Sequence, residues 1–126
     1  MEDIKIIHRW LDAISFSTVT GDLDAHMALV SRKVLVLGIP GVAPIDYSGW
    51  RKRRHTEFRK QLLQRITYRD ITILNSSSDE LTFKVREIIK ASTGQKVAVD
   101  KRVILAREPD DCWRVIEEHV DQVVHQ

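Results

Sequence analysis

The spacing of apolar residues changes once along the chain, which divides it into a helical first half and a strand-rich second half. From residue 3 to about residue 19, apolar residues recur every three or four positions, which predicts an amphipathic helix. Gly21 ends that helix. Asp22 or Asp24 can then cap a second, short helix that reaches about Val30.

A short strand and a third helix are expected next. Residues 34–37 are β-branched and apolar, which favours a strand, and residues 38–44 contain two Gly and two Pro, which predicts a loop. Ser48 can cap a helix over residues 49–65, in which Trp50 and other apolar residues are spaced by four. The opposite side of this helix is strongly basic, with Arg51, Lys52, Arg53, Arg59 and Lys60.

After the third helix the apolar period becomes two, which is typical of strands. Four strands are expected over residues 67–74, 81–91, 96–107 and 112–120, separated by clusters of turn-forming residues. The order helix, helix, strand, helix and four strands predicts an α+β fold. Its three N-terminal helices should cover one face of a curved, mostly antiparallel sheet, in a single domain over residues 1–126.

Composition excludes several other classes of protein. With 126 residues, 43% of them apolar and 30% charged, the chain has the make-up of one globular domain. No apolar run approaches the roughly 18 residues of a membrane span, and the N-terminus lacks a leader pattern, so we expect a cytoplasmic protein with no membrane partner. Cys112 is the single cysteine, which excludes an intrachain disulfide.

Three segments resemble one known family. These are GDLDAHMALVS at residues 21–31, SGW at residues 48–50, and WRVIEEHV at residues 113–120 after an acidic turn. Together with the order of elements, they make the whole chain similar to the nuclear transport factor 2-like superfamily, which includes SnoaL-like cyclases and ketosteroid isomerases. The resemblance implies a cystatin-like cone, open between sheet and helices, and a homodimer formed through the outer face of the sheet.

The resemblance does not extend to the catalytic residues of the isomerases. Where those enzymes have a tyrosine on the first helix, this chain has Ile14, and where they place the general-base aspartate, it has Gly38 and Ile39. Steroid isomerisation is therefore not expected.

Two charged residues interrupt apolar rows on neighbouring strands. Glu87 lies among alternating apolar residues of one strand, and Lys101 does the same in the next. A hairpin around Gly94 joins these strands. Two residues that face each other across the hairpin must both be odd or both be even, so the sum of their numbers is even. A sum of 188 places Glu87 opposite Lys101. A sum of 186 makes these two residues diagonal neighbours and sets Arg86 opposite Asp100. Either register brings the two charges together on the inner face.

Such a pair has two interpretations. It can be a buried ion pair that neutralises two awkward side chains. Alternatively, it is the polar anchor of a mostly apolar ligand pocket, in which desolvation raises the pKa of Glu87 and allows it to act as a general acid or base.

The third helix supplies further candidates for the pocket. Arg54 lies between Trp50 and Phe58 at a spacing of four, and His55 shares a side with Phe58 and Leu62. Arg54 either extends its head to solvent or donates to an anion or carbonyl at the mouth of the cone. His55 is either a surface residue or a group that moves protons beside the pocket carboxylate.

Other charged and polar residues suggest no further chemistry. The basic run of the third helix is balanced by acids elsewhere, so we expect a solvated face and no nucleic-acid partner. His26 has no acidic or histidine partner at ligand spacing, and the chain has no glycine-rich phosphate loop or Rossmann fingerprint, so no metal or organic cofactor is expected. On the last strand Glu117 and Glu118 point to opposite sides, and periodicity does not show which side is inward.

These observations favour a protein that binds a small hydrophobic or anionic molecule. We predict that Trp50, Arg54, Phe58, Glu87 and Lys101 line the pocket. An alternative is a cofactor-independent isomerase, dehydratase or cyclase in which Glu87 or His55 moves a proton while Lys101 or Arg54 stabilises an oxyanion. A third possibility is an accessory dimerisation module, a role that the resembled fold has in transport and scaffold proteins. Separately, the outer face of the predicted hairpin carries Ile88 and other apolar residues, which favours a homodimer.

Overall fold

The computed structural model describes residues 2–125 and has the predicted order of helices and strands. The elements are α1 (Glu2–Thr20), α2 (Leu23–Met27), β1 (Val30–Leu37), α3 (Tyr47–Arg59), β2 (Arg65–Ser76), β3 (Glu80–Lys90), β4 (Lys96–Arg107) and β5 (Trp113–His125). The α+β fold class is confirmed.

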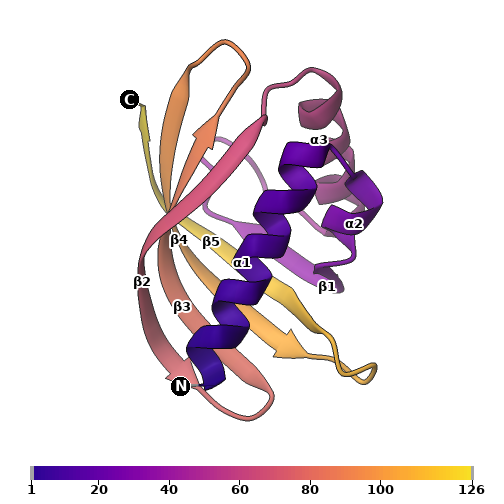
Figure 1. Ribbon diagram of the computed structural model, residues 1–126, viewed down its shortest axis with the longest axis vertical. Helices are drawn as coiled ribbons and strands as arrows, with labels where there is room; N and C mark the ends of the chain where they lie inside the picture. Colours follow the sequence, from indigo (N-terminus) through magenta and orange to yellow (C-terminus); the bar gives the residue numbers. More distant parts are fainter. Residues whose placement is uncertain (1, 126) are drawn as a thin grey trace.

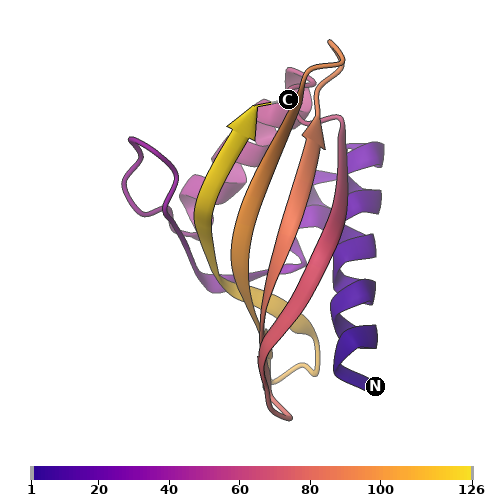
Figure 2. The same ribbon diagram turned by 90° about the vertical axis from the view of Figure 1, so that its left-hand side faces the viewer.

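The five strands form one curved sheet that the helices cover on a single side (Figure 1). The strand order is β1-β5-β4-β3-β2, in which β1 runs parallel to β5 and every other pair is antiparallel. Figure 2 shows the outer face of β2 to β5 without a helix in front of it. The core lies between the inner face and α1, where Ile7, Leu11, Phe83 and Leu105 are buried.

The third helix differs from its predicted bounds at both ends. Asp46 rather than Ser48 caps its N-terminus, because the Asp46 carboxylate accepts a hydrogen bond from the amide of Gly49 at 2.9 Å. The helix ends at Arg59, six residues before the predicted Arg65. Gln61 takes a left-handed backbone conformation with φ of 56°, and the next amide, at residue 62, bonds back to the carbonyl of residue 57. This is a Schellman termination without its usual glycine.

The bounds of the second helix and the first strand also differ from the prediction. The helix ends at Met27, and β1 begins at Val30 rather than at Val34. Of the additional strand residues, Val30 pairs with Val115 of β5, and the register is irregular between Val30 and Leu35.

The hairpin of β3 and β4 adopts one of the two predicted registers. Glu87 pairs with Val99, so the numbers of facing residues sum to 186. Arg86 then faces Asp100 on the outer side, and its Nε and Nη2 donate to the two carboxylate oxygens at 2.8 and 3.0 Å. This forked ion pair is absent from the other register, in which Arg86 would face Arg102.

The last strand is longer than predicted and changes face along its length. It extends to His125, and its register against β4 shifts between Ile104 and Leu105 and again between Asp100 and Lys101. Val115 and Glu118 are both buried although their numbers differ in parity. The register shifts explain why: an extra residue in a strand turns the following side chains to the opposite face. Glu118, and not Glu117, points inward.

His26 joins the three helices in the core. Its side chain is buried, its Nδ1 lies 3.0 Å from the hydroxyl of Ser17 on α1, and its ring meets Phe58 of α3 edge-on with centroids 5.2 Å apart. Burial, assisted by the positive charges of Arg54 and Lys101, lowers the pKa of His26 from 6.5 to about 3. The imidazole is therefore neutral in the folded protein at neutral pH.

This lowered pKa predicts a loss of stability under mild acid. The unfolded chain binds a proton on His26 as the pH falls through 6.5, whereas the folded chain does so only near 3. We expect the free energy of unfolding to fall by about 2 kcal/mol between pH 7.5 and 5.0, where carboxylates titrate little. Urea unfolding at both pH values measures it. His26→Gln should remove most of this loss and His55→Gln, at an exposed position, should retain it; equal losses in the two variants would contradict the prediction.

Candidate functional site

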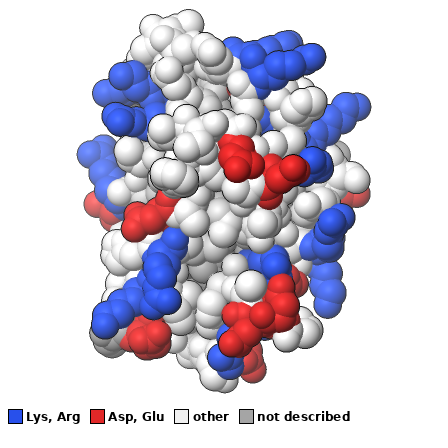
Figure 3. Space-filling model, turned by 45° about the vertical axis from the view of Figure 1, so that its right-hand side comes forward, with Lys and Arg blue, Asp and Glu red and all other residues white. Residues whose placement is uncertain are grey.

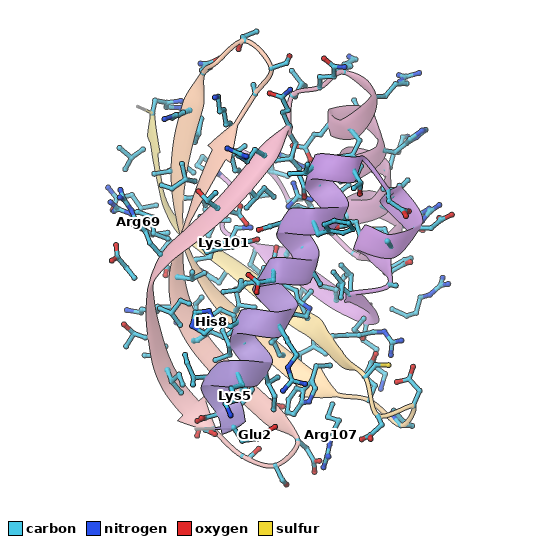
Figure 4. All side chains as sticks on the ribbon, in the orientation of Figure 1. Glu2, Lys5, His8, Arg69, Lys101 and Arg107 are labelled. Atoms are coloured by element: carbon cyan, nitrogen blue, oxygen red, sulfur yellow. The ribbon has the colours of Figure 1, made fainter. Side chains whose placement is uncertain are left out.

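A cavity of about 510 Å³ lies between the inner face of the sheet and α3. Most of its wall is apolar, and this part consists of Ile39, Pro40, Leu62, Ile89, Val97, Val99, Val120 and Val123. Trp50 and Arg54 of α3, Glu87 of β3 and Lys101 of β4 also line it. The structure therefore brings together four of the five predicted pocket residues. In Figure 4, Lys101 lies on the side of the sheet that faces the helices, whereas Arg69 projects from the outer face.

The polar end of the cavity is a cluster of buried charges. Lys101 Nζ lies 2.9 Å from Glu87 Oε1 and 3.6 Å from Glu118 Oε2, and all three side chains are at most 8% exposed. The hydroxyl of Tyr68 on β2 donates to Glu87 Oε2 at 2.9 Å. The predicted contact between Glu87 and Lys101 is confirmed, and a second carboxylate shares the ammonium group.

Arg54 brings a second buried cation to this end of the cavity. Its guanidinium stacks on the Trp50 ring, with Cζ 4.2 Å from the centroid, and Nη1 donates to Glu57 Oε1 at 3.0 Å. Its side chain is 6% exposed, so the guanidinium does not extend to solvent. Stacking on an indole and pairing with a carboxylate compensate for the lost hydration of a buried guanidinium.

The surrounding charges keep Glu87 and Lys101 ionised. Burial raises the pKa of Glu87, but the positive charges of Lys101 and Arg54 and the Tyr68 hydroxyl outweigh burial and hold it below the usual value. Burial alone would lower the pKa of Lys101, and Glu118 and Glu87 reverse that effect and raise it. The predicted increase in the pKa of Glu87 is therefore wrong. Glu87 is a carboxylate at neutral pH, so it can accept protons or hydrogen bonds but cannot serve as an acid.

Three buried polar atoms of the cluster make no hydrogen bond with any described residue. They are Glu87 Oε1, Glu118 Oε2 and Arg54 Nε. Lys101 contacts both carboxylate oxygens as an ion pair, without an aligned hydrogen bond. Two acceptors and one donor thus keep unused hydrogen-bonding capacity at this end of the cavity, which is uncommon because such atoms are costly to bury.

Two predicted site residues lie outside the cavity. Phe58 is partly buried and packs against His26 and the core, away from the residues that line the pocket. His55 is exposed on α3 and does not touch the pocket wall. The predicted shared side of His55 with Leu62 required the helix to continue past Arg59, which it does not.

Sequence reasoning missed Tyr68 and Glu118. Tyr68 occupies an ordinary strand position, and no local signal marks its hydroxyl as a partner of Glu87. Glu118 belongs to an adjacent pair of glutamates of which one had to point inward, but the bulges that select it are not visible in the pattern. The register shift that breaks the alternation of β5 also turns Glu118 inward, where it is the second carboxylate of the cluster.

A larger hollow of about 790 Å³ opens at the other end of the sheet, between the start of α1 and the β4–β5 turn. Most of its charged residues are exposed and paired: Arg9 lies 3.8 Å from Glu2, and Arg107 lies 3.0 Å from Asp79. Figure 4 labels Glu2 and Arg107 at this end, and Figure 3 shows basic and acidic side chains interspersed over the helix-bearing side. Since these charges already have partners, the smaller cavity with the buried cluster is the better candidate.

Within residues 2–125, no group of three or more His, Cys, Asp and Glu side chains is arranged to hold a metal ion. None of the helices in this range is long and apolar enough to cross a membrane.

Comparison with solved structures places this architecture in a known fold. A protein from Cytophaga hutchinsonii named NTF2-like superposes with a TM-score of 0.79 at 15% identity, covering 95% of this chain and 98% of its own. An NTF2-like protein from Pseudomonas aeruginosa gives 0.73 at 21% identity, over 100% and 99% of the two chains. A proposed scytalone dehydratase from Novosphingobium aromaticivorans gives 0.70 at 12% identity, over 98% and 87%.

Scans of the sequence against models of protein families and against curated proteins find no match. The structural similarity extends along nearly the whole chain, but sequence identity of 12 to 21% supports conclusions about the fold and not about activity. The protein has the cone-shaped fold of the nuclear transport factor 2-like superfamily, as the sequence resemblance implied.

Proposed function

We propose that this protein binds a small organic molecule in the cavity between the sheet and α3. The observation that carries the proposal is the combination of an apolar wall with a buried cluster of charges at one end. A volume of about 510 Å³ lies within the range of roughly 300 to 1,000 Å³ that is common for ligand pockets. Such pockets typically combine an apolar wall, which supplies affinity, with a few fixed polar groups, which orient the ligand.

A second candidate function is cofactor-independent general acid/base chemistry, such as dehydration or isomerisation. It is favoured by the contact of 2.9 Å between a carboxylate and an ammonium group beside the cavity. In this scheme Glu87 takes a proton from the substrate, while Lys101 and Arg54 stabilise a developing oxyanion. The proposed dehydratase that shares this fold gives a reaction class to test. Mass spectrometry of any bound ligand after incubation with the protein would show whether it is converted.

The proposal also includes a homodimer formed through the outer face of the sheet. Ile88, Ala98 and Val124 face one another across β3, β4 and β5, so an apolar row crosses three strands on the side that no described helix covers. A face of this kind favours association of two copies by two-fold symmetry.

The ligand proposal predicts stabilisation by compounds that fill the cavity. In a thermal-shift screen of small cyclic alcohols, ketones, lactones, carboxylates and steroids, at least one class should raise the Tm, because binding to the native state alone stabilises it by mass action. Val97→Phe places a larger side chain in the cavity wall and should abolish the shift. Thr72→Phe, at an exposed position of β2, should preserve it. Equal increases in Tm for the two variants would show that the compound binds outside this cavity.

The buried cluster predicts a large effect for loss of its cation. Lys101→Met leaves Glu87 and Glu118 buried without their shared ammonium group, so we expect the free energy of unfolding to fall by about 3–5 kcal/mol. Adding Glu87→Gln to this variant should recover part of the loss. Lys84→Met, at an exposed position of β3, should change stability by less than about 0.5 kcal/mol. Urea unfolding compares the three, and similar values for both lysines would show that the cluster is solvated.

The dimer proposal predicts a particle of twice the chain mass of 14.6 kDa in light scattering after gel filtration at micromolar concentration. Ile88→Lys places a charge in the apolar row and should give monomers. Phe16→Lys removes an apolar side chain that is 72% exposed on α1 and should leave the dimer intact. A monomeric wild-type protein would overturn this part of the proposal.

A further inference from the structure

We propose that the ligand of the cavity is an uncharged, largely apolar molecule that carries a hydroxyl group. This inference rests on the proposed binding function and specifies the chemistry that the site selects. It separates two ligand classes that the sequence left open, hydrophobic and anionic.

The charges around the cavity balance one another. Arg53, Arg54 and Lys101 contribute three positive charges, whereas Glu57, Glu87 and Glu118 contribute three negative ones. The four deepest of these groups, two cations and two carboxylates, also sum to zero. The imidazole of His125 lies at the exposed rim. No net charge therefore remains for an anion or a cation to neutralise.

A charged ligand would pay a desolvation penalty without a free partner. A carboxylate that entered the cavity could approach Lys101 only by competing with Glu87 and Glu118, which already share the ammonium group. A protonated amine could approach Glu87 or Glu118 only by competing with Lys101, which already contacts both carboxylates, and it would also meet the positive charge of Arg54. Burying an unpaired charge beside an already balanced cluster is strongly unfavourable, so both types of ligand should be rejected.

Three buried polar atoms of the cluster have no hydrogen-bond partner among residues 2–125. Glu87 Oε1 and Glu118 Oε2 can accept hydrogen bonds, and Arg54 Nε can donate one. All three atoms have almost no accessible surface, so a ligand group that bonds to Glu87 or Arg54 must come from the cavity that these residues line and must displace the side-chain atoms that cover them. A hydroxyl is the smallest uncharged group that both donates and accepts. It can donate to Glu87 and accept from Arg54, whereas a ketone can only accept.

The rest of the ligand is defined by the wall. Branched aliphatic side chains of β3, β4 and β5, together with Ile39 and Pro40 after β1, surround the polar end. They offer no hydrogen bond from their side chains, so the body of the ligand should be hydrocarbon. The geometry thus points to an alcohol on a cyclic or branched skeleton.

The test is a series of compounds with one skeleton and different polar groups. Isothermal titration would compare tetralin, 1-tetralone, 1-tetralol, tetralin-1-carboxylate and 1-aminotetralin. The alcohol should bind at least about tenfold more tightly than the hydrocarbon and the ketone, because a hydrogen bond to a charged group contributes more than the free energy of a tenfold change. The carboxylate and the amine should bind more weakly than the alcohol.

Variants that change the charge of the cluster should change this order in a defined way. Glu87→Gln keeps the shape of the side chain and an acceptor for Tyr68, but it gives the cluster one net positive charge. The carboxylate should then gain at least about tenfold in affinity relative to the alcohol. Glu118→Gln is a second route to the same net charge and should act in the same direction. Glu117→Gln, one residue away on the opposite face, is the matched control and should leave the order unchanged.

The outcomes separate the two proposals. If none of the compounds binds to wild type, including at millimolar concentration, both the binding function and the inference fail for this class of skeleton. If the carboxylate or the amine binds as tightly as the alcohol, the binding function stands and the inference is overturned. Equal affinity of tetralin and tetralol would also overturn it, because the unpaired atoms would then be completed by water and would select nothing.

Discussion

The burial of Lys101 between Glu87 and Glu118 is the interaction on which the arrangement of the site depends. Each of these charges would be strongly destabilising if it were buried alone, so their positions are tied together. They come from three neighbouring strands, and Arg54 adds a fourth charge from α3. Because rigid strands rather than loops carry most of the cluster, the polar end of the cavity is fixed by the register of the sheet.

The same cluster influences the helices across the cone. Its two cations, Arg54 and Lys101, help to keep His26 neutral, and neutral His26 can bond to Ser17 and pack against Phe58 where α1, α2 and α3 meet. The cluster also holds Glu87 ionised and Lys101 protonated at neutral pH. The site therefore presents fixed donors and acceptors to the cavity, and a change in the charge of one member would alter its neighbours.

Much of the fold and part of the site followed from local patterns. Parity along two strands was sufficient to bring Glu87 and Lys101 together, because side chains alternate between the faces of a sheet. Glu118 could not be predicted, since register shifts in the pairing of β5 with β4 reverse that alternation. The end of α3 was missed for a related reason: Gln61 takes the left-handed conformation that usually marks a glycine, so the sequence carries no stop signal there. A sequence pattern reflects the regular geometry of a helix or strand. The bulges of β5 and the end of α3 are departures from that geometry, so the pattern does not predict them.

Stability alone gives a poor account of the charged cluster. Buried ion pairs are often no more stable than well-packed apolar residues of similar size, and the surrounding positions show that this chain readily places Val, Ile and Leu on the inner face. The cluster moreover leaves two carboxylate oxygens and one guanidinium nitrogen without hydrogen bonds, which lowers stability further. These unpaired atoms are concentrated at one end of a cavity, and their donors and acceptors match what an uncharged polar group can offer. The proposed binding site accounts for both the placement of the charges and the incompleteness of their hydrogen bonding, whereas a structural ion pair accounts only for the first.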